Sequence, residues 1–125
     1  MEAQALHEVA HARTDELPGA LLEHPFGPQA DVYKVRGKVF MLASVRQDDP
    51  IVTLKAAPAD ARILCEAYAD ITPGYHMNKR HWITVQSGGD VDAGLLRDLV
   101  TESYLLVVET LPRAQRPVNP ETFGQ

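Results

Sequence analysis

The sequence predicts a single α+β domain, and two observations lead to this fold class. Three segments carry apolar residues at three- and four-residue spacing, as amphipathic helices do, and the segments between them are rich in β-branched and aromatic residues, as strands are. The chain has 125 residues, 45% of them hydrophobic and 23% charged, which suffices for one core of ordinary composition. We expect that core within residues 1–112, with residues 113–125 as a C-terminal extension.

The first predicted helix runs from Glu2 to Leu17, with Leu6 and Ala10 on its apolar face, and a Pro-Gly pair ends it. The stretch HPFGP, residues 24–28, is too rich in proline and glycine for a helix or a central strand. It predicts an extended connector that is held in place by burial of Phe26.

The next segments predict antiparallel strands. Asp31–Val35 and Lys38–Val45 are rich in Val, Tyr, Phe and Leu, and they flank Arg36-Gly37, which is a short turn of the kind that makes a hairpin. The polar run RQDDP, residues 46–50, predicts a second turn, and Ile51–Lys55 alternates as a third strand. Three antiparallel strands in succession are the simplest arrangement of these segments.

The second half of the chain predicts two further helices and one more strand. Pro58 can open a helix that continues to Ala69, and Trp82–Val85 is typical of a strand. The longest helix is predicted from Asp92 to Leu111, because leucine and valine recur at helical spacing until Pro112 breaks the pattern.

Charge is distributed unevenly along the chain, whose formal net charge is -5. Residues 1–30 carry five acids and one Arg, residues 31–85 six acids and eight Lys or Arg, and residues 86–125 six acids and three Arg. The acidic total argues against general attraction to nucleic acid, and only the middle third has a basic bias. One cysteine, no apolar run long enough for a membrane and no secretory leader predict a cytoplasmic protein without membrane contacts.

The first helix contains HEVAH, residues 7–11, which matches a zinc-binding pattern. On a helix, His7 and His11 lie one turn apart and can bind Zn²⁺ together, while Glu8 could activate a water molecule. A catalytic zinc needs a third protein ligand and a cleft, and no preceding element provides a wall for one. We therefore predict helix surface here, with no metal and no catalytic residue.

The segment PGYHMNKRHW, residues 73–82, contains the densest set of polar and aromatic side chains. Lys79 and Arg80 suit contacts with phosphate, a histidine and an amide can form hydrogen bonds, and an aromatic ring can stack on a base. The structural alternative is that Tyr75, Met77 and Trp82 fill the core, while Asn78 stabilises a turn.

With its neighbours, this segment resembles the MmcQ/YjbR family of small bacterial proteins. Four blocks match in order and spacing, over about residues 17–113. They are HPFGP, the hairpin VYKVRGKVFMLAS with TLKAAP, the segment PGYHMNKRHW, and the helix LLRDLVTESYLLVVETLP.

The resemblance implies a two-layer fold in which a twisted antiparallel sheet is covered by helices on one face, similar to secretion-chaperone-like domains. Members of the family are described as DNA-binding, with a proposed double wing of β-hairpins. The implied DNA-binding residues are Lys34, Arg36, Lys38, Lys55, His76, Asn78, Lys79, Arg80 and Trp82.

These observations favour a non-enzymatic DNA-binding protein without a cofactor, either a monomer or a homodimer. Because the chain is acidic, its DNA binding should be weak and should fall steeply with salt. One alternative is a protein-interaction or chaperone-like module that uses an exposed sheet face. A second is a small-ligand or zinc enzyme built on His76 and His81 or on the HEVAH helix.

Overall fold

The computed structural model describes residues 1–124, which form one layer of helices against one antiparallel sheet. The sheet has six strands in the order β1-β2-β3-β4-β6-β5, and each neighbouring pair is antiparallel. The helices are α1 (Ala3–Thr14), α2 (Pro58–Ala67) and α3 (Ala93–Glu109), with a short 3-10 helix η1 (Arg113–Gln115). The strands are β1 (Ala20–Glu23), β2 (Asp31–Val35), β3 (Lys38–Arg46), β4 (Asp49–Lys55), β5 (Ile71–Pro73) and β6 (Trp82–Gln86).

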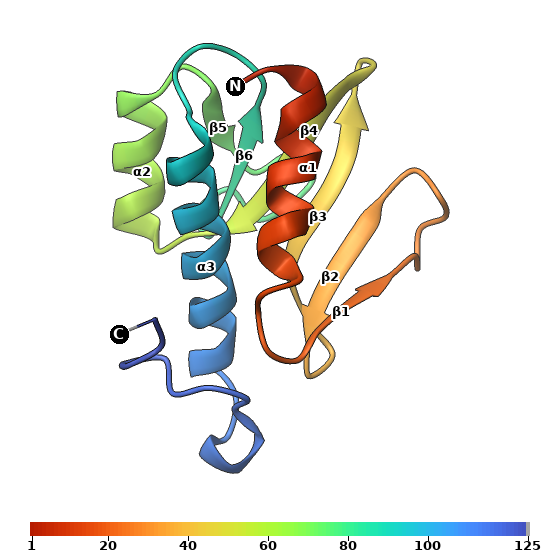
Figure 1. Ribbon diagram of the computed structural model, residues 1–125. Coiled ribbons are helices and arrows are strands. Elements are labelled where there is room, and N and C mark those ends of the chain that lie inside the picture. Colours follow the sequence, from red (N-terminus) through yellow and green to blue (C-terminus); the bar gives the residue numbers. More distant parts are fainter. Residues whose placement is uncertain (125) are drawn as a thin grey trace.

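The predicted two-layer α+β fold is confirmed. Figure 1 shows α1 and α3 in front of the middle of the sheet, with α2 beside β5 and β6. Local sequence explains several element ends: Pro58 occupies the first turn of α2, and the Asp92 side chain caps α3 by accepting from the Leu95 amide at 2.8 Å. No helix of residues 1–124 is both long enough and apolar enough to cross a membrane.

Two tight turns connect the three central strands. Arg36 and Gly37 have φ of 51° and 82°, and Gln47 and Asp48 have φ of 52° and 68°. Positive φ at both central residues characterises the turns that match the twist of a hairpin. Both predicted turns are confirmed, but the second takes only two residues of RQDDP, since β3 continues to Arg46 and β4 begins at Asp49.

The core lies between the sheet and the helices. Along β4, Val52 and Leu54 point into it, while their cross-strand neighbours Ala43, Val85, Met41 and Ile83 complete an apolar layer beneath the helices. Each of these six side chains is at most 3% exposed. Burial of apolar area on this face provides the main driving force for folding.

A β-bulge in β3 is held by a polar group inside this core. Tyr33 pairs with Met41 and Lys34 with Val39, so Phe40 is an extra residue in the ladder. The fully buried Ser103 hydroxyl donates to the Phe40 carbonyl at 2.5 Å and accepts from the backbone amide of Lys55 at 2.8 Å. Ser103 thus satisfies two backbone groups that would otherwise be buried without a partner.

The opposite face of the sheet, here called the second face, is also largely buried although the helices lie on the other side. Val32, Ile51, Thr53 and Thr84 are at most 2% exposed. The Thr53 and Thr84 hydroxyls lie 3.3 Å apart, within hydrogen-bonding distance. The expectation of an open sheet face for partner binding is therefore wrong, because chain segments cover its middle.

Two other expectations need correction. Phe26 is 70% exposed rather than buried, because its connector follows the edge strand β1 and extends beyond the helices. Strands β1 and β5 were missing from the predicted sheet, since they have four and three residues and too little length to show alternation.

The C-terminal segment returns to the body of the molecule below α3. The Arg116 side chain donates to the carbonyls of Leu111 and Glu109 at 2.9 and 2.8 Å, which caps the end of the helix. The Phe123 ring lies 6.1 Å from the Tyr104 ring, centroid to centroid. Residues after Pro112 therefore contribute to the surface at this end of the fold.

Candidate nucleic-acid interface

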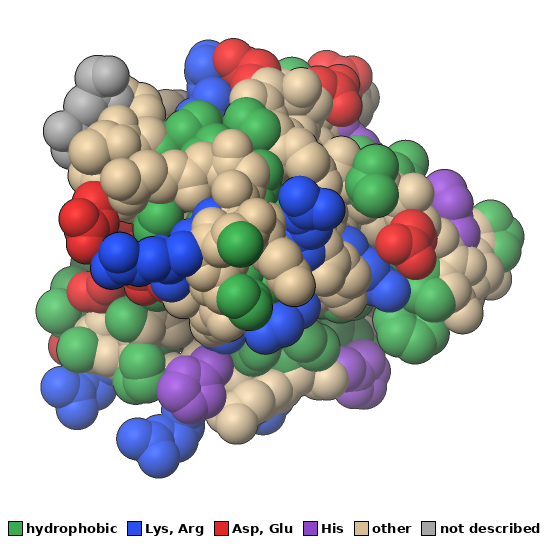
Figure 2. All heavy atoms as spheres, turned by 90° about the horizontal axis from the view of Figure 1, so that it is seen from below, with side chains coloured by type: hydrophobic (Ala, Val, Ile, Leu, Met, Phe, Trp, Pro, Cys, Tyr) green, Lys and Arg blue, Asp and Glu red, His purple; other side chains and the backbone are tan. Residues whose placement is uncertain are grey.

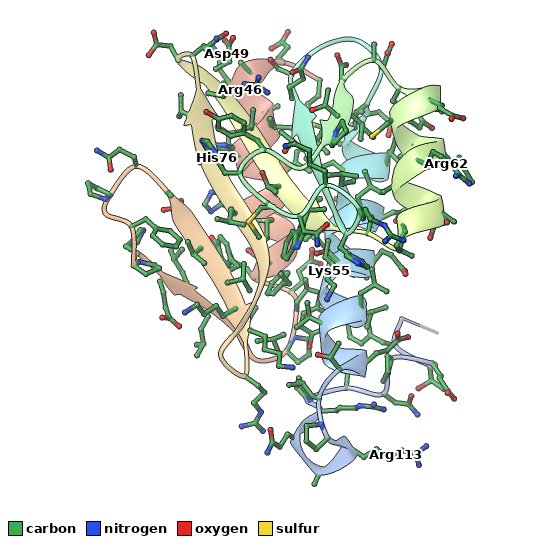
Figure 3. The ribbon with its side chains drawn as sticks, turned by 180° about the vertical axis from the view of Figure 1, so that it is seen from behind. Arg46, Asp49, Lys55, Arg62, His76 and Arg113 are labelled. Carbon is green, nitrogen blue, oxygen red and sulfur yellow. The ribbon has the colours of Figure 1, made fainter. Side chains whose placement is uncertain are left out.

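The connection between β5 and β6, residues 74–81, crosses the second face of the sheet (Figure 3). Its first residue closes the loop, because the Gly74 amide donates to the Trp82 carbonyl at 2.8 Å. A Cβ atom at position 74 would lie only 2.6 Å from the Trp82 Cβ, so glycine is required by this close approach. The Pro73-Gly74 pair thus fixes the point at which the loop leaves the sheet.

The first half of this connection is anchored to the second face by Tyr75. Its backbone amide donates to Thr84 Oγ1 at 2.8 Å, and the Arg46 guanidinium carbon lies 4.5 Å from the centre of its ring, within cation–π range. The exposed His76 is adjacent, with its ring centroid 3.9 Å from that of Tyr75 and φ of 60°. Tyr75 serves as cover for the sheet, whereas His76 faces outward (Figure 3).

The second half of the connection is a compact turn that presents two cations. Asn78 Oδ1 accepts from the Arg80 amide at 3.0 Å, and the Asn78 carbonyl accepts from the His81 amide at 3.1 Å. Lys79 Nζ donates to the Gly74 carbonyl at 3.0 Å. Asn78 therefore acts within the turn, and the charges of Lys79 and Arg80 are placed on the surface.

The tip of the β2–β3 hairpin lies against the C-terminal segment. Arg36 Nε donates to the Gln115 carbonyl at 3.0 Å, and Lys38 Nζ donates to Thr110 Oγ1 at 3.2 Å. Both acceptors are uncharged, so the two positive charges are not neutralised by these bonds. The tip is exposed and its cations are held in defined positions.

Lys34 and Lys55 differ in what surrounds them. Lys34 Nζ lies 3.4 Å from a carboxylate oxygen of Glu23, which neutralises it. Lys55 is the last residue of β4 and is paired across the sheet with Trp82. No ion pair involves Lys55 within residues 1–124, and it lines a hollow between α2 and α3 together with Asp60 and Glu102.

Strand register brings most of the predicted residues to one end of the sheet. Lys55 ends β4 and pairs with Trp82 at the start of β6, and the turn at Arg36 lies beyond this pair at the same end of the sheet. Residues 79–81 directly precede β6 and lie at the same end. We call this group the basic end, and its members are Arg36, Lys38, Lys55, Lys79 and Arg80.

Figure 2 views the molecule toward this end. Lys and Arg side chains occur across the middle of the view, and Asp and Glu lie mainly toward its margins. Two arginines that were not predicted for the site belong to the same region, Arg113 and Arg116 of the C-terminal segment. The sequence did contain a signal for these two residues. They follow Pro112, where α3 was predicted to end, and cations favour helix C-termini.

The second hairpin tip differs from the first in position and in charge. It carries Asp48 and Asp49, and β3 separates it from the tip at Arg36. The nine residues of β3 span about 30 Å at the usual strand rise. Successive hairpins of this chain therefore do not form two neighbouring basic wings.

The histidines of HEVAH have separate partners. His7 Nε2 lies 3.0 Å from the Ile51 carbonyl, and His11 Nδ1 lies 2.5 Å from the Tyr33 hydroxyl, with His11 Nε2 3.3 Å from Asp31 Oδ2. Burial lowers the pKa of His11, with Asp31 opposing the shift. Residues 1–124 contain no group of three or more His, Cys, Asp or Glu that could hold a metal ion.

These features define a small α+β protein with an antiparallel sheet, helices on one face, a loop across the other and one basic end. The chain matches the sequence profile of the YjbR family over residues 15–106, and it belongs to that family. The HEVAH sequence lies outside the matched region.

Relatives and solved structures agree with this assignment. The chain is 46% identical to the uncharacterized protein YbdF of Escherichia coli O157:H7, covering 96% of this chain and 99% of YbdF. It is 33% identical to the uncharacterized protein YjbR of Escherichia coli K12, covering 70% and 75% of the two chains. The crystal structure of Deinococcus radiodurans protein DR2400 is similar, with a TM-score of 0.82 and 35% identity over 91% of this chain and 89% of that one.

Proposed function

We propose that this protein binds DNA without catalysing a reaction, and that the basic end provides the contacts. The observation that carries this proposal is how its cations are bonded. Arg36, Lys38 and Lys79 donate to carbonyl or hydroxyl oxygens rather than to carboxylates. Such bonds restrict the side chains and leave their charge free to interact with phosphate.

The distribution of ion pairs supports the same location. Of the 12 Lys and Arg residues, three form ion pairs with acids in the part of the chain that the structure describes, namely Arg13, Lys34 and Arg97. The remaining nine include all five members of the basic end. Lys34, in contrast, is a weak candidate for a phosphate contact, because Glu23 already neutralises it.

The mode of binding is predominantly electrostatic and weak. Five phosphate contacts correspond to a slope of about -4.5 for the logarithm of the association constant against the logarithm of salt concentration. The chain carries a net charge of -5, so association should be detectable mainly at low ionic strength. His76 and Asn78 are expected to position the loop rather than to contribute positive charge to the interaction with phosphate.

The experiment is a salt titration of binding to duplex DNA, followed by fluorescence anisotropy. In the Lys79→Ala plus Arg80→Ala protein the slope should become shallower, about -2.7, since two phosphate contacts are lost. The control is Arg13→Ala plus Arg97→Ala, which makes the same change in net charge but removes cations already paired with Glu16. Equal slopes for the two double variants would overturn the proposal.

The edge strand β1 favours a second candidate function, binding of a protein partner. Leu21, Leu22 and Phe26 are 63%, 46% and 70% exposed on β1 and the connector after it. An unpaired edge with exposed apolar residues can accept a further strand. If this edge joins two copies of the chain, the Leu21→Lys plus Phe26→Ser variant should no longer self-associate in sedimentation experiments. Unchanged self-association would exclude β1 as the binding surface.

A further inference from the structure

A groove lies between α2 and the end of the loop on the second face, at the margin of the basic end. Its volume is about 620 Å³, a size typical of sites for small molecules and too small to admit a duplex. The polar, charged and thiol groups that line it include Arg62, Cys65, Glu66, Lys79 and Arg80. Figure 3 shows Arg62 projecting from α2 on the outer side of this region.

The groove carries positive charge without a matching number of acids. Arg62, Lys79 and Arg80 contribute three cations, and Glu66 is the one carboxylate among the lining residues. None of the three cations forms an ion pair with an acid of residues 1–124. Lys79 is held by the neutral Gly74 carbonyl, at 3.0 Å. This leaves an excess of two positive charges in a concave site.

We infer that this groove binds a phosphate monoester at the end of a nucleic-acid strand, an inference that rests on the proposed DNA binding. A phosphate within a strand is a diester with one negative charge and lies on a convex backbone. A terminal monoester carries a charge of about -1.5 to -2 and three acceptor oxygens. Two arginines and a lysine match that charge, and guanidinium groups can bind such oxygens in pairs.

The arrangement of the basic end agrees with a terminal contact. Arg36 and Lys38 lie on the other side of Lys55 from the groove, because β3 and β6 flank β4 in the sheet. A strand whose last phosphate enters the groove can therefore pass its next phosphates over Lys55 toward the hairpin tip. Arg62 contacts only the terminal group in this arrangement.

The test compares three duplexes of one sequence, which carry a 5′-phosphate, a 3′-phosphate or hydroxyl groups at both ends. We expect one of the phosphorylated duplexes to bind about tenfold more tightly than the hydroxyl duplex, since one charge-assisted contact is added. Arg62→Ala should remove this preference and leave binding of the hydroxyl duplex unchanged. Arg97→Ala, also on an exposed helix surface, should keep the preference.

The outcomes separate the two proposals. If all three duplexes bind with equal affinity, the monoester inference is overturned while DNA binding stands. If none binds at low salt, DNA binding itself fails. A nucleoside 5′-monophosphate that competes as strongly as the phosphorylated duplex would show that the groove takes a free nucleotide, and would overturn its role in holding a strand end.

Cys65 provides a second readout within the same groove, because it is the one cysteine of the chain. Bound phosphorylated duplex should slow alkylation of this thiol several-fold relative to the hydroxyl duplex at equal occupancy. Equal alkylation rates would place the terminal phosphate elsewhere. A circular dichroism spectrum of Arg62→Ala that matches the wild type would show that a lost preference does not reflect unfolding.

Discussion

The two faces of the sheet are both buried but by different means. On the helix side, Met41, Leu54 and Ile83 form a dry apolar layer under α1 and α3. On the second face, the Thr53 and Thr84 hydroxyls pair with each other, and Thr84 also accepts from the Tyr75 amide of the covering loop. Helix packing supplies free energy on the first face, whereas hydrogen bonds position a loop on the second.

This difference explains why the segment PGYHMNKRHW, residues 73–82, has two roles. Its first half, with Gly74 and Tyr75, is required to seat the loop on the threonines. Its second half, with Lys79 and Arg80, projects cations at the basic end. The hypotheses of a structural turn and of a phosphate contact therefore apply to different residues of one segment.

The largest expected effect on stability comes from substitutions at two neighbouring residues of β4 whose side chains face opposite sides of the sheet. Leu54→Ala should lower the free energy of unfolding by about 2–5 kcal/mol, because it leaves a cavity in the apolar layer. Thr53→Val keeps the side-chain volume and loses one hydrogen bond, so it should cost less than about 1.5 kcal/mol. Urea unfolding measures both, and similar costs would remove the distinction between the two faces.

Gly74→Ala should have an intermediate effect on stability. The added Cβ would lie 2.6 Å from that of Trp82, and the forced shift should cost about 1–3 kcal/mol. Gly89→Ala is the matched control, since a Cβ there meets no atom within 4 Å. The fluorescence of Trp82 reports on the loop directly, and an unchanged spectrum and stability in Gly74→Ala would contradict the close approach.

The smallest expected effect is a pH dependence on the helix side. Burial lowers the pKa of His11 below its ordinary value of 6.5, and His7, Asp15 and Asp31 are the charged groups that act on it. The unfolded chain therefore takes up this proton first, so stability is lost as pH falls from 6.5 through the lower folded pKa. His11→Gln should lose less stability than the wild type between pH 7.5 and 5.5 in urea unfolding. An identical loss would show that His11 does not contribute.

The sequence was sufficient for the helices and the central strands because their periodic patterns are long. α3 was expected over Asp92–Leu111 and lies over Ala93–Glu109, and β2 was predicted with its observed bounds. The edge strands could not be predicted in this way. Their few residues carry no alternation, and they are strands only because β2 and β6 offer a partner.

The candidate site was only partly predictable for a similar reason. Sequence places Lys79 and Arg80 in a turn, but their alignment with Lys55 and Arg36 depends on strand register. Arg62 was not predicted, since it belongs to a helix whose exposed face has no distinguishing pattern. Lys34 was predicted for the site, and its pairing with Glu23 arises from the unpredicted strand β1.

An NMR titration with duplex DNA at low salt tests the central claim most directly. Backbone amide shifts should change at the basic end, at Arg36, Lys38, Lys55 and residues 79–80, with little change at Asp48 and Asp49 at the other end of the sheet. Shift changes centred on the acidic tip or on β1, or no change at all, would contradict the proposal that the basic end binds DNA.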